Sequence, residues 1–383
     1  MKDDRTPTIT MRLDGIIDQA VSDGVIVGAD VLVAQDNNLV YRKAAGWLDR
    51  EARLPMPVDA IFRFSSLTKP IVSSAALILV ERGILRLDDE VTEHLPEFQP
   101  RLPSGASAQI TIRQLLTHTA GLTYGFFQSA DGPYRQAGIS DGFDASGVTI
   151  EDNLRRISQV PLSYVPGERW GYSVATDVLG GVMEKVADAR LEAILRDLVL
   201  DPLDMCHTSF HPPGRSNLAV PYIDGAGSPQ RMTDAQVTSF GEGEVRFAPD
   251  CAWEEGSFQS GGSGLFGTGS DYLVFLEAIR SGGIPIMSRD SASLLTGNAI
   301  GDLPVDVMGP GWGFGMGAAV LTRPEPASTP QNIGTWHWSG AYGHHWFVDP
   351  VERLTTLVMT NTSFAGMVGP FPDAIRDAVY DAG

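Results

Sequence analysis

The sequence contains few cysteines and no long run of apolar residues. Cys206 and Cys251 are the only two cysteines among 383 residues. Two cysteines are too few for a framework of disulfides, and they fit a reducing cytoplasm. The longest apolar stretch, around residues 75–80, is far too short to cross a bilayer. The amino terminus also lacks a basic segment followed by an apolar one, so a secretory signal is not expected. Together these features predict a cytoplasmic protein without a membrane partner.

Positive charge is scarce, and lysine is scarcer still. The net charge is −19, from 28 basic and 47 acidic residues, so the protein's field repels nucleic acid and anionic lipid. It also fails to attract substrates that carry a carboxylate. Only four of the basic residues are lysines, namely Lys2, Lys43, Lys69 and Lys185. Because lysine, unlike arginine, can lose its proton when desolvated, a lysine beside an apolar segment, as Lys69 is, suggests a chemical role.

The order of the expected elements indicates an α/β (α+β) fold around one antiparallel sheet. A strand hairpin is expected over 24–47, helices over 66–82, 111–116, 150–158, 176–200 and 270–280, strands over 312–321, 335–348 and 354–361, and a closing helix over 370–380, with a surface loop over 122–148 and an irregular segment over 211–258. Successive strands without intervening helices pair antiparallel. Residues 1–85 and 232–383 are therefore predicted to form an α/β domain of sheet flanked by helices. Residues 86–231 are predicted to form an inserted, mainly helical lobe.

A serine and a lysine stand three residues apart where a helix is expected to begin. Positions i and i+3 share one face of a helix, so the Ser66 hydroxyl and the Lys69 amine can meet. A serine hydroxyl is a weak nucleophile until a base takes its proton, and a neutral lysine in a dry pocket can be that base. The same spacing also arises by chance, with Ser66 as a helix cap and Lys69 at the surface.

Two further segments offer groups for the same chemistry. Tyr172 follows a Pro-Gly loop just before the helix expected from residue 176, where its phenol can share in proton transfer. The alternative is an ordinary packed tyrosine. Small residues follow the strand near Trp338, so a substrate can approach the backbone closely. A backbone N–H there, together with that of Ser66, would form an oxyanion hole.

Taken together and in this order, the three motifs resemble those of the serine β-lactamase and penicillin-binding-protein superfamily. Supporting stretches lie at 115–122 and 261–265, and the resemblance covers nearly the whole chain. It is strongest to the family VIII carboxylesterases. It implies a β-lactamase/transpeptidase-like fold with the active site in the cleft between the domain and the lobe.

The resemblance also implies a role for each matched residue. Ser66 would be acylated, and Lys69 and Tyr172 would act together as general base and then acid. The backbone N–H groups of Ser66 and Ala341 would form the oxyanion hole. Tyr124 would line the cleft.

Two positions depart from the β-lactamase pattern and bear on the substrate. The third motif usually begins with a cation that holds a carboxylate, but here it reads Trp338-Ser339-Gly340. The second motif usually carries Asn two residues after its tyrosine, to hold an amide, but here that residue is Val174. An ester needs neither contact. We therefore expect a carboxylesterase for small, uncharged esters with short acyl groups, with residual β-lactam reactivity.

Other activities and ligands are weighed against this interpretation. A β-lactamase, a D-amino-acid peptidase or amide hydrolase, and an acyltransferase share the fold, and a slowly acylated binding protein is the contrasting class. No cofactor or metal site is expected, because His344 and His345 are adjacent on a strand and point to opposite faces. One of these histidines, assigned here to His344, is expected to line the cleft with Val174, Trp338, Ser339 and Gly340. The oligomeric state is not predicted.

Overall fold

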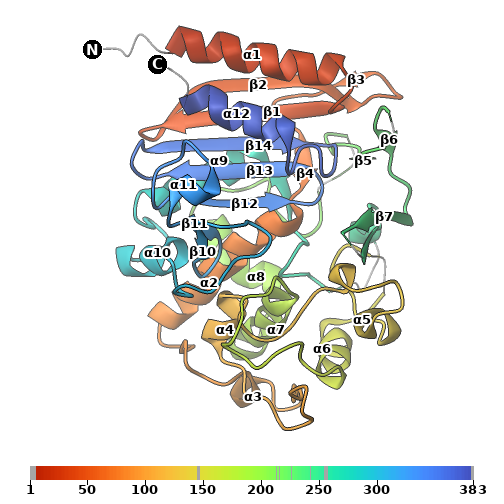
Figure 1. Cartoon of the computed structure of the whole chain (residues 1–383), viewed down its shortest axis with the longest axis vertical. Helices are drawn as coiled ribbons and strands as arrows, with labels where there is room; N and C mark the ends of the chain where they lie inside the picture. Colours follow the sequence, from red (N-terminus) through yellow and green to blue (C-terminus); the bar gives the residue numbers. More distant parts are fainter. Residues whose placement is uncertain are drawn as a thin grey trace.

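One antiparallel sheet built from both ends of the chain organises the molecule (Figure 1). The computed structural model describes residues 6–380 except 145–146, 213, 215, 226, 242 and 254–257. The strand order is β10-β11-β12-β13-β14-β1-β2-β3, and every neighbouring pair is antiparallel. The strands are β1 (Gly28–Gln35), β2 (Asn38–Asp49), β3 (Leu54–Pro55), β10 (Trp312–Phe314), β11 (Ala319–Leu321), β12 (Trp336–Gly340), β13 (His344–Asp349) and β14 (Leu354–Thr360). The pairing of β1 with β14 joins the two chain ends, as the sequence predicted.

Helices cover both faces of this sheet, so its central strands are apolar on both sides. The helices α1 (Thr6–Ser22) and α12 (Pro370–Tyr380) lie side by side on one face (Figure 1). They bury Val31 of β1 and Val358 of β14 against apolar side chains such as Ile17 and Ile375. The helix α9 (Gly269–Arg280) packs on β1 and β14 from the other face, where Leu32 and Met359 join the main core.

The middle of the chain forms the mainly helical part, at the lower end of the view in Figure 1. It contains α3 (Val91–His94), α4 (Ile112–Leu116), η2 (Gly125–Phe127), α5 (Pro133–Gln136), α6 (Ile150–Gln159), α7 (Ala175–Ala187), α8 (Leu191–Leu195) and the π-helical η3 (Arg196–Leu200). The helix α2 (Thr68–Glu81) contacts α7, α8 and η3 from the sheet side. This apolar helix, buried along most of its length, therefore links the two parts of the molecule.

Short strand pairs bridge the remaining segments. They are β4 (Ile61–Arg63) with β9 (Phe266–Thr268), β5 (Tyr222–Ile223) with β6 (Gln230–Arg231), and β7 (Gln236–Phe240) with β8 (Gly243–Phe247). Isolated bridges join Ser209 to Phe266, Leu218 to Ile61, and Tyr222 to Thr362. The last part of the predicted lobe is thus hydrogen-bonded to the sheet side. The division at residues 85 and 231 remains a prediction.

Several sequence predictions about single elements were wrong. The helix expected over 176–200 breaks at Asp188, which adopts a left-handed conformation with φ 47°, a region that aspartate tolerates better than most residues. The strand expected over 312–321 is two short strands, β10 and β11. The helix expected from residue 270 begins at Gly269 and is capped by Thr268. The helices α1 and α10 (Arg289–Thr296) and the β7–β8 hairpin were not predicted.

Gly340 sets how closely the sheet approaches the segment that carries Ser66. A Cβ atom at Gly340 would lie 2.7 Å from the Phe64 carbonyl oxygen and 2.9 Å from a methyl carbon of Leu67. These two residues flank Ser66 in the chain. The absence of a side chain at Gly340 thus lets β12 pack closely against the segment around Ser66.

We expect Gly340→Ala to lower the free energy of unfolding by about 1–3 kcal/mol, the usual cost of overpacking. Gly15→Ala is the matched control, because Gly15 lies within α1 and no packing neighbour comes within 4 Å of the place a methyl group would take. Alanine there should be neutral or stabilise by up to about 1 kcal/mol. Urea unfolding of both variants beside the unmodified protein measures the difference. Equal stability of the two variants would contradict the close approach.

Candidate active site

Ser66 lies in a strained turn between a strand and a helix. The 3₁₀ turn η1 (Ser65–Leu67) connects β4 to α2, and Ser65 has a positive φ of 52°. Such a conformation costs a non-glycine residue free energy and persists only where its surroundings hold it. Here the Phe64 N–H donates to the Leu265 carbonyl, and the Leu265 N–H donates to the Thr68 hydroxyl. These hydrogen bonds to the segment around Leu265 thus hold the turn that carries Ser66 at the junction of sheet and helices.

The Lys69 amine is buried beside the Ser66 hydroxyl, on the first turn of α2. Its Nζ lies 3.2 Å from Ser66 Oγ and donates to the Gly262 carbonyl at 2.7 Å. Burial lowers the pKa of Lys69 to about 7, although the nearby Asp177 carboxylate opposes this change. A substantial fraction of the amine is therefore neutral near physiological pH, which is the state a general base requires.

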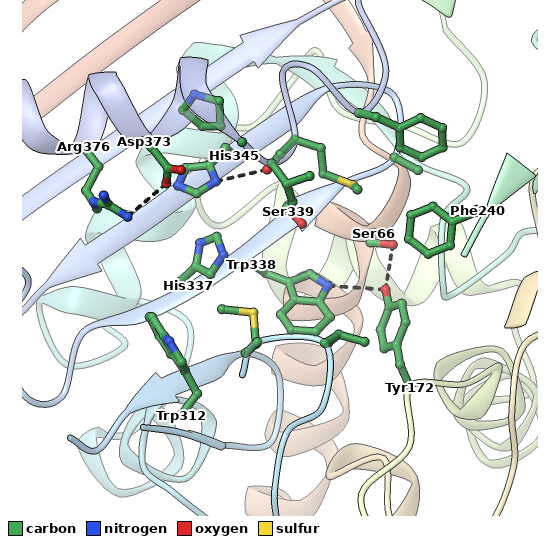
Figure 2. Close-up of a pocket in the computed structure, with 18 of the residues that line it drawn as sticks. Ser66, Tyr172, Phe240, Trp312, His337, Trp338, Ser339, His345, Asp373 and Arg376 are labelled. Carbon is green, nitrogen blue, oxygen red and sulfur yellow. Dashed lines mark hydrogen bonds and ion pairs between the residues drawn. The ribbon is translucent and has the colours of Figure 1, made fainter. Parts of the chain in front are cut away.

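Tyr172 approaches Ser66 from the loop before α7. Its hydroxyl donates to Ser66 Oγ at 2.7 Å and accepts a hydrogen bond from Trp338 Nε1 at 3.3 Å (Figure 2). The Lys69 amine lies 4.7 Å from the centre of the Tyr172 ring. Burial raises the pKa of Tyr172 above its ordinary value, so the phenol keeps its proton. The structure thus brings Lys69 and Tyr172 within hydrogen-bonding distance of Ser66 Oγ, so the three predicted catalytic side chains lie together.

Asp177, which sequence reasoning missed, lies behind this group. Its Oδ1 accepts from Ser260 Oγ at 2.6 Å and from the Gly262 N–H at 3.2 Å. Burial raises the pKa of its carboxyl, and the Ser260 hydrogen bond and the Lys69 charge act in the opposite direction. Gly262 therefore connects the two ionisable groups, since its N–H meets Asp177 and its carbonyl meets Lys69. In the sequence, Asp177 is indistinguishable from an ordinary acidic residue in the first turn of a helix.

A cavity of about 520 Å³ opens at Ser66 and Tyr172. Of the predicted binding residues, Trp338, Ser339 and Ala341 line it. Phenylalanines from distant segments form much of its wall, namely Phe126, Phe127, Phe143, Phe240 and Phe364. Three of them come from the region 122–148 that the sequence suggested was a surface loop. Core side chains there, rather than the glycines and serines, decide how that region packs.

The other four predicted binding residues lie in the interior, outside the cavity lining, namely Tyr124, Val174, Gly340 and His344. Tyr124 stacks on Phe126, and Val174 is fully buried at the start of α7. His344 Nε2 is bonded to the Arg63 carbonyl at 2.7 Å, so this histidine braces β4. Its neighbour on the opposite face, His345, lines the cavity instead. The choice between the two adjacent histidines was therefore wrong.

The backbone N–H of Ala341 already has a partner in the structure. It donates to the hydroxyl of Ser65, the residue before Ser66, at 3.2 Å. Its predicted place in the oxyanion hole requires a substrate oxygen to displace that hydroxyl. This role remains a prediction.

Neither a metal centre nor a membrane span is found in the part of the chain that the structure describes. No three histidine, cysteine, aspartate or glutamate side chains gather there in an arrangement that could hold a metal ion. Among the described helices, none is long and apolar enough to cross a bilayer.

Comparison with known proteins identifies the family. The family model named Beta-lactamase matches residues 13–379. Esterase EstB of Burkholderia gladioli is 45% identical over 378 residues, which cover 97% of this chain and 95% of that protein. The chain belongs to the β-lactamase family. The superfamily resemblance indicated by the three motifs is thereby confirmed.

Solved structures show the same fold. EstCE1, described as a hydrolase with promiscuous acyltransferase activity, has a TM-score of 0.95 at 40% identity and covers 98% of this chain and 99% of its own. Simvastatin synthase LovD from Aspergillus terreus has a TM-score of 0.73 at 21% identity, covering 97% of this chain and 98% of its own, and this likeness concerns the fold alone. The predicted β-lactamase/transpeptidase-like fold is confirmed.

We expect the Lys69 amine to titrate near pH 7, because burial lowers its pKa to about 7. With only four lysines in the chain, lysine labelled with carbon-13 at Cε gives few signals to assign by NMR. Neutral amine should accumulate as the pH rises through 7. Lys43 is the internal control: burial lowers its pKa, but hydrogen bonds to Asp18 and Asp14 outweigh burial and leave the pKa raised. A Lys69 signal that titrates with that of Lys43 would contradict the assignment.

Proposed function

We propose that this protein is a serine carboxylesterase, a member of the family VIII carboxylesterases, that hydrolyses small uncharged esters through an acyl-enzyme on Ser66. The observation that carries the proposal is the position of Ser66 Oγ, 3.2 Å from the Lys69 amine and 2.7 Å from the Tyr172 hydroxyl. A neutral amine beside the nucleophile can activate it, and a protonated phenol in the same site can protonate the alcohol that leaves the ester.

The two pKa shifts suggest how the protons move. In the proposed acylation, neutral Lys69 takes the Ser66 proton while Oγ attacks the ester carbonyl. The ester C–O bond then breaks, and Tyr172 gives its proton to the departing alkoxide. Lys69 returns its proton to Tyr172, which restores both groups. In deacylation water takes the place of Ser66 as the nucleophile: Lys69 accepts its proton, and Tyr172 protonates Ser66 Oγ as the acyl bond breaks. The products are the carboxylic acid and the free Ser66 hydroxyl.

Backbone donors are proposed to stabilise the tetrahedral oxyanion. We assign this role to the N–H groups of Ser66 and Ala341, two residues that line the cavity. Preorganised donors of this kind typically contribute about 3–4 kcal/mol of transition-state stabilisation each. Ser65 Oγ, which holds the Ala341 N–H at 3.2 Å, would give way to the substrate oxygen.

The walls of the cavity favour esters over β-lactams and peptides. At the position where the family usually has a cation, the Trp338 indole directs its N–H to Tyr172. The only fully charged groups that line the described cavity, Asp373 and Arg376, form an ion pair with each other at 2.9 Å. A substrate carboxylate near Ser66 would thus lose a charge-assisted hydrogen bond, at a cost of about 1.5–3 kcal/mol. The 45% identical relative named Esterase EstB agrees with this preference.

Acyl transfer to an alcohol is the second candidate activity. The 40% identical EstCE1 is described as a hydrolase with promiscuous acyltransferase activity. The phenylalanine-rich cavity wall disfavours water relative to a bound alcohol, so an alcohol can take the acyl group from Ser66. Product analysis with an added alcohol separates the two outcomes.

A cytoplasmic location is part of the proposal. It rests on the thiol state of Cys206 and Cys251, which suits a reducing compartment.

The decisive experiment compares ester and β-lactam turnover in the unmodified protein and in Ser66→Ala. We expect rapid hydrolysis of p-nitrophenyl butyrate and slow hydrolysis of a chromogenic cephalosporin, because Trp338 offers no cation to the cephalosporin carboxylate. Both activities should vanish in Ser66→Ala. A better rate with the cephalosporin would favour the β-lactamase alternative, and full activity of Ser66→Ala would overturn the mechanism.

Removing the Tyr172 hydroxyl should slow the reaction more than it weakens substrate binding. We expect Tyr172→Phe to lower kcat about 10²–10⁴-fold, the usual contribution of general acid–base catalysis, with little change in KM. Tyr41→Phe serves as the control, because the Tyr41 hydroxyl bonds Asp14 on the far side of the sheet. Steady-state kinetics on one ester suffices. A Tyr172→Phe variant with the kcat of the control would remove Tyr172 from the mechanism.

A further inference from the structure

The cavity is larger than a short-acyl ester requires. Its volume of about 520 Å³ falls in the range that binds drug-sized ligands. Its lining includes residues from His337 in β12 to Ala341 just after that strand, a span of roughly 13 Å at the rise of a β-strand. Figure 2 shows Ser66 and Tyr172 on one side, and His337, His345, Asp373 and Arg376 on the other. A short acyl ester bound at Ser66 therefore leaves this second group, the distal end, unfilled.

Two histidines on neighbouring strands form the centre of the distal end. His337 of β12 and His345 of β13 lie on the same face of the sheet, and their ring centres are 4.5 Å apart. His337 Nδ1 lies 2.6 Å from the Trp346 carbonyl oxygen, and His345 Nδ1 lies 3.2 Å from that of Met367. Because a carbonyl oxygen only accepts hydrogen bonds, each Nδ1 must carry the proton.

The tautomer leaves each Nε2 as a hydrogen-bond acceptor. Within the described part of the chain, each of these two rings forms its hydrogen bond through Nδ1. Burial lowers the pKa of His337 to about 4 and lowers that of His345 well below its ordinary value. Both rings are therefore neutral at physiological pH. The pair can accept hydrogen bonds from a ligand but has no positive charge for an anion.

The arginine at the distal end is already paired with two carboxylates. Arg376 Nη1 lies 2.9 Å from Asp373 Oδ1, and its Nη2 lies 2.7 Å from Asp377 Oδ1. Asp377 lies outside the cavity lining, and the Arg376 charge still reaches the histidines, since it helps to lower the pKa of both His337 and His345. Because the guanidinium already has two carboxylate partners, a substrate carboxylate gains little from it, whereas the two neutral imidazoles favour a neutral group that donates hydrogen bonds.

We propose that the distal end is a specificity subsite for a hydroxyl group, or another neutral hydrogen-bond donor, at the far end of an ester with an apolar middle. The proposal rests on the esterase function above. The donor binds the Nε2 atoms of His337 and His345, while the apolar part of the substrate crosses the cavity between them and Ser66. Short esters remain substrates, but they use only the end near Ser66.

A matched set of esters tests the length and the terminal group together. The set consists of p-nitrophenyl esters of linear acids, from butanoate to dodecanoate, that end in a methyl, a hydroxyl or a carboxylate group. At the length that reaches the distal end, we expect the hydroxyl ester to have a kcat/KM roughly two- to tenfold above the methyl ester, the value of one net hydrogen bond. The carboxylate ester should be the poorest of the three.

Two substitutions at one position separate acceptor from structure. His337→Asn retains a side-chain N–H one bond beyond Cγ, where Nδ1 bonds Trp346, but has no atom at the Nε2 position. His337→Gln can place an amide oxygen near Nε2. We expect His337→Asn to abolish the preference for hydroxyl over methyl, and His337→Gln to retain part of it. His207→Asn, at an exposed histidine outside the cavity, should keep the full preference.

Each outcome bears on a defined part of the proposal. A hydroxyl preference that is lost in His337→Asn and kept in His207→Asn supports the subsite. Hydrolysis of every ester without such a preference overturns the subsite and leaves the esterase function intact. A preference for the carboxylate ester assigns the distal end to Arg376 and overturns the proposal. If Ser66-dependent hydrolysis of all the esters is absent, the proposed function fails, and the subsite that rests on it fails too.

Discussion

The burial of one amine is the constraint from which the arrangement of the site follows. Lys69 is buried, and its amine is hydrogen-bonded to the Gly262 carbonyl and the Ser66 hydroxyl. A charged amine in such a place is costly, so burial shifts its equilibrium toward the neutral form. Asp177 limits this shift through its negative charge. Both groups are hydrogen-bonded to Gly262, Lys69 to its carbonyl and Asp177 to its N–H. The Asp177 charge therefore influences the pKa of Lys69 without an ion pair between the two side chains.

This constraint explains why the sheet and the helical part must join at α2. The helix supplies Lys69 on its first turn, the preceding turn supplies Ser66, and the segment before α7 supplies Tyr172. None of these side chains could hold its place on an exposed loop. The close approach of β12 at Gly340 completes the packing around the strained Ser65. Stability and chemistry therefore depend on the same contacts at this junction.

The sequence predicted the central sheet, the helices α4 and α6, the start of α7, and the meeting of Ser66 with Lys69 and Tyr172. These predictions succeeded because strand alternation, helix periodicity and the order of the three motifs can all be read along the sequence, without knowledge of the tertiary packing. Asp177 and the cavity phenylalanines were missed because only tertiary packing gives them a common neighbour. The wrong choice between His344 and His345 has a similar origin. Period-two alternation says that they diverge, but it does not say which face of β13 the cavity occupies.

The cavity draws its two ends from separate parts of the chain. The end near Ser66 depends on η1, α2 and the loop before α7, whereas the opposite end includes Asp373 and Arg376 from α12, the last helix. Changes in α12 can therefore alter which molecules fit without disturbing the groups that break the bond. In evolutionary terms, the carboxy-terminal helix gives this fold a means to diversify its substrates while its chemistry stays constant.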